Sequence, residues 1–204
     1  MRITVATKSA TRQRILEAAK GLLLADGWNH TTTRGIAIAA GIATGTLFNY
    51  FPTKEAIAAA LIADALEGAA KEFREGTPEN SLEADLFTLV WSGLRKLSDY
   101  RKFLGQALDS VFSPLARSSP ESAGEALRVD HLELVESTIS AHGYPGPRSP
   151  VTVQLYWTLY LGIFAFWAAD DSPGQEDTLA LLDRSLKLFV ASLSIGQEGT
   201  NERR

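Results

Sequence analysis

Residues Thr31 to Lys54 read TTTRGIAIAAGIATGTLFNYFPTK, and this stretch decides how the chain folds at its N-terminal end. Thr32 is placed to cap a first short helix, because its hydroxyl accepts one of the N–H groups that a first helical turn leaves unpaired. Gly41 ends that helix, since glycine reaches the left-handed conformation without a Cβ clash. A second short helix is expected over Thr44 to Phe51, and Pro52 cannot continue it.

The second helix is expected to have an inward and an outward face. Leu47 and Phe51 lie one turn apart and should point inward, which leaves the residues between them, with Thr46, facing out. Two short helices joined by a glycine turn, the second displaying small polar groups, form the helix-turn-helix pattern of DNA-binding proteins.

The same stretch resembles the DNA-binding domain of the TetR (tetracycline-repressor) family of transcriptional regulators. The matching runs are Thr31-Thr32, Ile36-Ala37, Ala40-Gly41-Ile42, Gly45 to Phe51, and Lys54-Glu55. Three positions depart from the family pattern: Gly35 replaces an acidic residue, Ala43 a common Ser, and Phe48 a common Tyr. These departures remove a capping-box partner of Thr32 and two hydroxyls, so weaker or differently distributed contacts to the DNA backbone are expected.

The resemblance also implies which side chains contact DNA. Thr44 and Thr46 are expected to reach base edges, and Gly45 to let the backbone approach closely. Asn49 is a further expected contact, to adenine, and phosphates are assigned to Thr33, Arg34, Tyr50 and Lys54. The full expected DNA-binding set is Thr32, Thr33, Arg34, Thr44, Gly45, Thr46, Phe48, Asn49, Tyr50 and Lys54. The alternative for each threonine is a helix cap or a solvated surface residue.

The charge is divided unevenly along the 204 residues, although the net value is only −4. Residues 1–54 contain seven Lys or Arg and two acidic residues, a net charge of +5, whereas the remaining 150 carry −9. A basic N-terminal segment on an acidic body directs a polyanion to that segment. The chain has no cysteine, which excludes disulfides, thiol nucleophiles and thiolate metal sites. Its first residues lack the apolar stretch of a signal peptide, so a cytoplasmic, nucleoid-associated location is expected.

The rest of the chain predicts further helices and no strands, an all-α fold of about nine helices in total. We expect a three-helix helix-turn-helix DNA-binding domain over residues 1–53, a helical ligand-binding and dimerisation domain over 54–195, and a disordered polar tail over 196–204. A first helix is expected from Thr11 to Asp26, where Gly27 ends it, and Trp28 directly after this stop is expected in the core. Thr53 caps a long helix from Lys54 to about Arg74, which links the two domains without a break. A capping box from Asn80 to Glu83 then opens a helix to about Tyr100, and a shorter helix is expected from about Arg101 to Phe112. Three Ser-Pro pairs, at 119–120, 149–150 and 172–173, are favoured helix starts.

The nineteen residues from Val151 to Ala169 contain no charge and are almost long enough to cross a bilayer. Internal Thr and Gln residues, and an acidic end without a basic flank, argue instead for a helix covered by protein, and no membrane partner is expected. The final helix carries a matching apolar stripe, so both helices are expected to form a four-helix homodimer interface. The expected interface residues are Trp157, Leu161, Leu182, Leu186, Phe189 and Leu193. The alternative is that both helices belong to the core of a monomer.

By the same resemblance, the acidic body should bind an unknown small apolar or aromatic molecule between its helices. The expected pocket residues are Phe87, Trp91, Phe103, Phe112, His131, Tyr156, Tyr160 and Phe164. An aromatic residue on a helix stripe is also an ordinary core residue, and a lone histidine an ordinary hydrogen-bonded one.

An enzyme is disfavoured, because the sequence has no phosphate-binding glycine loop, no Gly-x-Ser-x-Gly elbow and no histidines at motif spacing. No catalytic residue, metal site or cofactor is therefore expected. The sequence predicts a dimeric repressor that a ligand releases from a palindromic double-stranded DNA operator. The alternative is a DNA-binding activator, or a regulator that does not respond to a small molecule.

Overall fold

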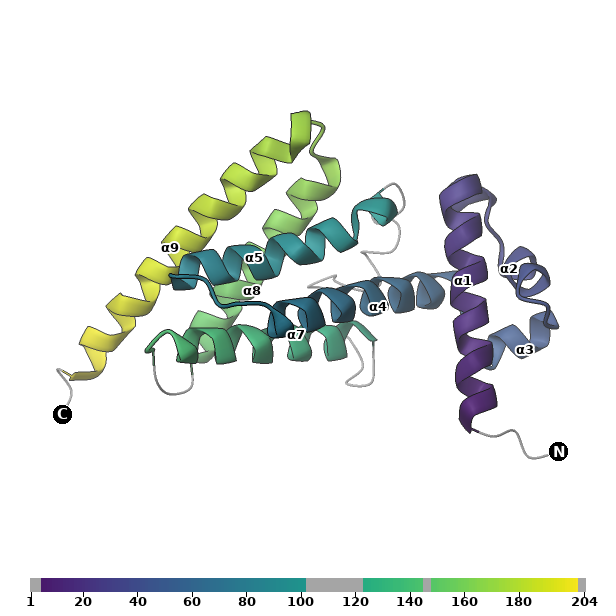
Figure 1. Ribbon diagram of the computed structural model, residues 1–204, viewed down its shortest axis with the longest axis horizontal. Helices are drawn as coiled ribbons and strands as arrows, with labels where there is room; N and C mark the ends of the chain where they lie inside the picture. Colours follow the sequence, from purple (N-terminus) through teal and green to yellow (C-terminus); the bar gives the residue numbers. More distant parts are fainter. Residues whose placement is uncertain (1–4, 102–122, 145–147, 202–204) are drawn as a thin grey trace. The chain divides into compact units, whose positions relative to one another are not determined.

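The computed structural model describes residues 5–101, 123–144 and 148–201, and in these ranges every regular element is helical (Figure 1). The all-α prediction is confirmed. The expected short helix from about Arg101 to Phe112 and the start at Ser119-Pro120 lie outside the described residues. The described α-helices are α1 (Val5–His30), α2 (Thr33–Ala39), α3 (Thr44–Phe48), α4 (Lys54–Glu75), α5 (Leu82–Lys96), α7 (Ala123–Ala141), α8 (Pro150–Ala169) and α9 (Glu176–Asn201), with 3-10 turns η1 (Ser98–Tyr100) and η2 (Pro173–Gln175).

The described residues fall into two compact units, and α4 contributes to both. One unit takes Met1–Ala65 with Leu97–Glu125, and the other takes Leu66–Lys96 with Ala126–Arg204. The first half of α4 therefore packs with the N-terminal helices and its second half with the C-terminal ones. We call the first unit the head and the second unit the body. The expected boundary at residues 53 and 54 stays a prediction.

Two glycines and one helix cap separate the short helices of the head. Gly27 leaves helical geometry at φ 75° and bends α1 near its end. Thr32 then caps α2 by accepting the Gly35 N–H at 3.0 Å, as the sequence predicts. Gly41, at φ 66°, separates α2 from α3. α1 begins earlier than the expected Thr11, because nothing between Val5 and Thr11 breaks a helix. These elements bury one shared core: Ile15, Leu16, Ala19, Leu23, Ile36, Ala37, Leu47, Phe51 and Ile57.

The body packs α5 against α8 and α9, and α8 against α9 (Figure 1). Ser149 caps α8 by accepting the Thr152 N–H at 3.1 Å, as the sequence predicts. α5 is capped by Ser81, which accepts the Ala84 N–H at 3.2 Å, one residue after the Asn80 that the expected capping box places there. Core residues come from each of these helices and from α7, and the largest fully buried side chains among them are Phe164, Trp167, Phe189 and Leu86.

The start and the end of α9 differ from the sequence prediction. Ser172-Pro173 opens only the turn η2, because Gly174 and Gln175 both take positive φ. The start of α9 is fixed instead by Asp170, which is buried and accepts the Thr178 N–H at 3.0 Å. At its other end α9 continues to Asn201, so the part of the expected disordered tail up to this residue is helical. A single glycine such as Gly196 weakens a helix without ending it.

α8 is, in the described ranges, the one helix long and apolar enough to cross a membrane by length and composition alone. Tyr156, Tyr160, Ile163, Phe164 and Trp167 are buried on its inner side. Burial along one side is the pattern of a core helix.

Candidate functional site

The helix α3 presents its polar and aromatic groups outward around one buried anchor. Leu47 is fully buried, whereas Gly45, Phe48 and Asn49 are exposed, and Thr44 and Thr46 are half-buried. Phe48 is 47 % exposed, a large apolar surface to leave in water on a helix of five residues. The exposed side of α3 therefore offers hydroxyls, an amide and an aromatic ring to a partner.

Gly45 leaves an opening in the middle of this surface. A Cβ built at Gly45 would meet no atom within 4 Å, and the residue does not need a positive φ. Nothing inside the chain therefore requires glycine at this position. Because Gly45 has no side chain, the backbone of α3 is accessible there, and another molecule can approach it closely.

The start of α2 flanks α3 with further polar groups. The Thr32 hydroxyl is engaged as the cap of α2, while Thr33 is half-buried and Arg34 is exposed. Tyr50, after α3, is half-buried. The chain thus places the expected contact residues of α2 and α3 on neighbouring packed helices, since α2 contacts both α1 and α3.

Lys54 is held by the protein itself. Its Nζ donates to the Trp28 carbonyl at 2.7 Å and to the Thr31 carbonyl at 3.0 Å, and it lies 4.2 Å from the centroid of the Trp28 ring. The ammonium has three N–H donors, so these bonds leave at most one for a phosphate. The contacts of Lys54 in the head thus differ from the role that the sequence predicted.

Two other cations of the head also contact aromatic rings. Arg12 lies 5.7 Å from the Phe51 centroid and 3.5 Å from Asp64, and Lys20 lies 5.5 Å from the Tyr100 centroid. These side chains still contribute positive charge, but they are partly committed to packing. Arg34, in the first turn of α2, is an exposed cation within the helix-turn-helix.

In the body, an aromatic cluster forms around His131 of α7. Its Nε2 lies 3.0 Å from the Tyr156 hydroxyl, and its ring centroid lies 4.3 Å from that of Tyr160. Trp157 stacks on Tyr160 at 5.3 Å, and Phe164 follows at 6.2 Å. Burial lowers the pKa of His131 to about 4, so the imidazole is neutral at pH 7. Burial also raises the pKa of Tyr156 and Tyr160.

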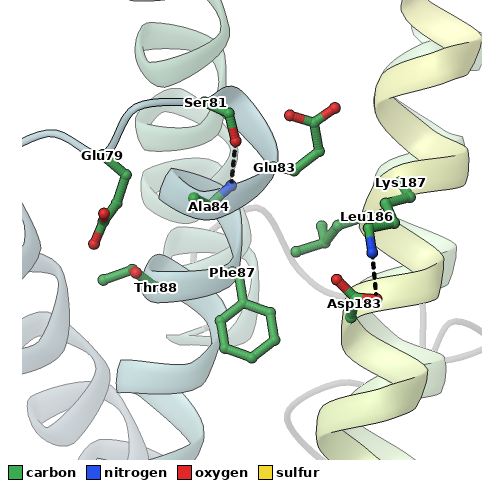
Figure 2. Close-up of a pocket in the computed structure, with 9 residues that line it drawn as sticks. All are labelled: Glu79, Ser81, Glu83, Ala84, Phe87, Thr88, Asp183, Leu186 and Lys187. Atoms are coloured by element: carbon green, nitrogen blue, oxygen red, sulfur yellow. Dashed lines mark hydrogen bonds and ion pairs between the residues drawn. The ribbon is translucent and has the colours of Figure 1, made fainter.

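A separate open groove of about 380 Å³ lies between α5 and α9 (Figure 2). The ring of Phe87 points into it from α5 and Leu186 faces it from α9. The rim is polar and partly paired, since Lys187 Nζ lies 2.8 Å from Asp183 and Ser81 caps α5. The lining residues are Glu79, Ser81, Glu83, Ala84, Phe87, Thr88, Asp183, Leu186 and Lys187.

Both α8 and α9 expose large apolar side chains, which we call together the apolar stripe of α8 and α9. Val151, Leu155 and Phe166 of α8 are 77 %, 41 % and 44 % exposed, and Leu188 of α9 is 71 % exposed. Gly162 lies between them on the exposed side of α8, and a Cβ there would meet nothing within 4 Å. Small and apolar residues on one face favour close packing of helices from another molecule.

The expected interface residues are mostly buried within the single chain, and their part in a dimer stays a prediction. Trp157, Leu182, Leu186, Phe189 and Leu193 are buried within the single chain, and Leu161 is half-buried. They hold α8 and α9 to the body's own core. Because α8 is apolar on all sides, the sequence pattern could not tell its inner side from its outer one.

Sequence profiles of known families match both units of the chain. The profile of "Bacterial regulatory proteins, tetR family" matches residues 15–61, and that of "Tetracyclin repressor-like, C-terminal domain" matches residues 86–197. The chain belongs to the TetR family. The profile of the bacterial regulatory proteins covers all of α2 and α3 with parts of α1 and α4.

Two individual proteins are similar to parts of the chain. The nucleoid occlusion factor SlmA of Actinobacillus pleuropneumoniae is 33 % identical over 103 residues, which cover 48 % of this chain and 51 % of SlmA. The transcriptional regulator UidR of Escherichia coli is 37 % identical over 65 residues, 32 % of this chain and 33 % of UidR. The chain thus matches about half the length, or less, of these relatives.

Solved TetR-family structures match nearly the whole chain in fold. A TetR regulator from Rhodococcus has a TM-score of 0.69 at 18 % identity, covering 89 % of this chain and 97 % of its own. Thermus thermophilus FadR, a TetR-family repressor solved with lauroyl-CoA, has a TM-score of 0.66 at 25 % identity, covering 88 % of this chain and 93 % of its own.

The structure groups only part of the expected TetR-family ligand pocket. His131, Tyr156, Tyr160 and Phe164 form the aromatic cluster, whereas Phe87 lines the groove with residues that are not in that cluster. Trp91 is half-buried on α5, and Phe103 and Phe112 lie outside the described residues. Within the described ranges, no group of three or more His, Asp or Glu side chains could hold a metal ion.

Sequence reasoning missed two features of the TetR-family fold. Asp170 is buried, and hydrogen bonds from Ser172 and Thr178 hold its pKa well below its usual range. The carbonyl contacts of Lys54 were also not foreseen, although Trp28 directly after a helix stop was a signal that another group packs there.

Proposed function

We propose that this TetR-family regulator is a dimeric repressor that binds a palindromic operator and leaves it when a small molecule binds the body. The observation that carries the proposal is the surface of α3, where Gly45 opens a gap between exposed hydrogen-bonding and aromatic groups. These exposed groups do not pack against the rest of the head, and a helix that displays such groups suits the major groove of DNA.

On this surface, Thr44 and Thr46 contact base edges and Asn49 accepts and donates to an adenine. Gly45 allows the backbone of α3 to approach the DNA. Arg34 is the main phosphate contact, because it is exposed and charged, with Thr33 and Tyr50 beside it. Thr32 and Phe48 complete the contact surface. These assignments explain why small and exposed residues are concentrated on α3.

A dimer is supported by the apolar stripe of α8 and α9. Four large apolar side chains, Val151, Leu155, Phe166 and Leu188, would be removed from water by a second copy. A two-fold axis would then present two heads to half-sites about 34–36 Å apart, or a multiple of that. The operator is therefore palindromic, as a symmetric reader requires.

Release by a ligand is supported by the family and by the body's aromatic surface. FadR of Thermus thermophilus was solved with lauroyl-CoA, so a member of this fold accepts an acyl compound. We propose an apolar or aromatic ligand that contacts the surroundings of His131, Tyr156 and Tyr160. Its binding favours a conformation of α4 that does not match the half-site spacing, which is a population shift. A regulator of this kind acts in the cytoplasm, on the nucleoid.

The proposal is tested by selecting bound fragments from genomic and random DNA with the full-length chain. We expect a palindromic site whose affinity falls steeply with salt. Thr44→Ala should change the preferred sequence, whereas Arg34→Ala should weaken binding to all sequences and lower the salt slope. A selection that yields no preferred sequence would contradict the proposal. An operator that no apolar or aromatic compound releases would instead favour the ligand-independent regulator or activator.

A further inference from the structure

The ammonium of Lys54 is the meeting point of three helices of the head. It stands on the first residue of α4 and bonds the carbonyls of Trp28, near the end of α1, and Thr31, just before the cap of α2. The same nitrogen lies over the Trp28 ring at 4.2 Å. All of these residues belong to the head.

The two carbonyls lie where α1 ends and α2 begins. α1 ends at His30 and α2 starts at Thr33, so Trp28 belongs to the last turn of α1 and Thr31 to the short connection. The helix dipole makes the carbonyl end of a helix negative. A cation placed on these carbonyls and on an indole face satisfies them and is itself stabilised.

Thr31 transmits this contact to the recognition unit. It is 3 % exposed, and its hydroxyl donates to the Gly27 carbonyl at 2.8 Å. Thr32, the next residue, caps α2, and α2 packs on α3. The position of the Thr31 carbonyl therefore determines where α2 begins, and α2 in turn supports α3.

We propose that Lys54 is a positioning residue that fixes α2 and α3 to the start of α4, and that it does not act as a phosphate contact. Its effect on DNA binding is exerted through the placement of α3. The proposal rests on the DNA-binding role of the head, and it adds a link between α4 and α3 that uses backbone carbonyls and Trp28.

The two roles of a cation differ in a measurable quantity. A side chain that neutralises a phosphate releases counterions, so its removal lowers the slope of log K against log salt by about 0.9 for each contact. Removal of a side chain that positions α3 lowers the affinity for the preferred operator and leaves this slope unchanged. Its removal also loosens α2 in the free protein, an effect that can be measured without DNA.

The experiment compares Lys54→Met, which keeps the apolar stem and removes the charge, with Arg34→Ala as the matched loss of a head cation. A third variant, Trp28→Leu, removes the ring and leaves Lys54 in place. Operator binding is measured as a function of salt for the full-length chain. Amide hydrogen exchange of the peptide covering residues 27–40 is measured without DNA.

We expect Lys54→Met and Trp28→Leu to weaken operator binding by about tenfold or more at an unchanged salt slope, and to speed exchange in residues 27–40 by about fivefold or more. Arg34→Ala should lower the slope by about 0.9 per head and leave exchange unchanged. A lowered slope with unchanged exchange for Lys54→Met would overturn the proposal, as would faster exchange with unaltered operator affinity. If the parent chain binds no preferred operator, the exchange measurement still tests the link while the proposed function fails separately.

Discussion

His142 Nε2 lies 2.6 Å from Asp85 Oδ2, and this contact joins the end of α7 to the first turn of α5. The side chain of Asp85 is 8 % exposed and that of His142 is 20 % exposed. The other carboxylate oxygen of Asp85 accepts the Glu79 N–H at 2.8 Å. One buried carboxylate thus fixes both α7 and the segment that leads into α5.

Replacing Asp85 should therefore destabilise the body. Asp85→Ala leaves the imidazole of His142 and the Glu79 N–H without their acceptor, and hydrogen bonds to a charged group are worth about 1.5–3 kcal/mol each. We expect the free energy of unfolding to fall by about 2 kcal/mol or more in urea titration. Asp64→Ala, which removes an exposed pair with Arg12, is the control and should cost less than about 1 kcal/mol. If both variants lost the same free energy of unfolding, the buried contacts of Asp85 would contribute no more to stability than the exposed pair.

Gly45→Ala should separate folding from DNA binding. The added methyl has open space, and alanine favours a helix over glycine by about 1 kcal/mol, so the melting temperature should stay equal or rise. Operator affinity should fall by about tenfold or more, because the methyl would stand between α3 and the DNA. Gly68→Ala, which also adds a methyl into open space on α4, is the matched control. Unchanged operator affinity for Gly45→Ala would remove Gly45 from the contact surface.

Leu188→Glu should break the proposed dimer without harming the core. Leu188 is 71 % exposed, so a carboxylate there is solvated in a monomer and buried without a partner in a dimer. We expect the dissociation constant of the dimer to rise about a hundredfold or more in analytical ultracentrifugation. Val129→Glu on α7, at a position that is 42 % exposed, should leave the dimer intact. A Leu188→Glu chain that still sediments as a dimer would place the interface elsewhere.

The features that sequence reasoning predicted correctly depend on local chemistry. The caps by Thr32 and Ser149, and the stop at Gly41, need only residues within one helical turn, so their spacing in the sequence is sufficient. The buried Leu47 and Phe51 follow from helical periodicity in the same way.

The features that sequence reasoning missed depend on contacts between distant segments. Lys54 lies 26 residues from Trp28, and Asp85 lies 57 residues from His142. Residue patterns within a short stretch of sequence do not predict contacts over such separations. The sequence also could not predict which side of α8 faces out. Apolar residues occur all around this helix, and packing against α9 determines which of them are buried.

His131 should make the stability of the body depend on pH in mildly acidic solution. Burial lowers the pKa of His131 from 6.5 to about 4 in the folded chain, so between these values the unfolded chain binds more protons than the folded one. The free energy of unfolding should therefore rise with pH from about 4 to 6.5 and level off above, by an amount on the order of 3 kcal/mol for full titration. His131→Phe should flatten this rise, even if the loss of the Tyr156 hydrogen bond lowers stability at pH 7. His30→Gln, at an exposed position on α1, should keep the pH dependence of the parent chain. Urea titrations across this pH range measure the free energy of unfolding at each pH. If it changed with pH in the His131→Phe variant as it does in the parent, His131 would not be the source of the pH dependence.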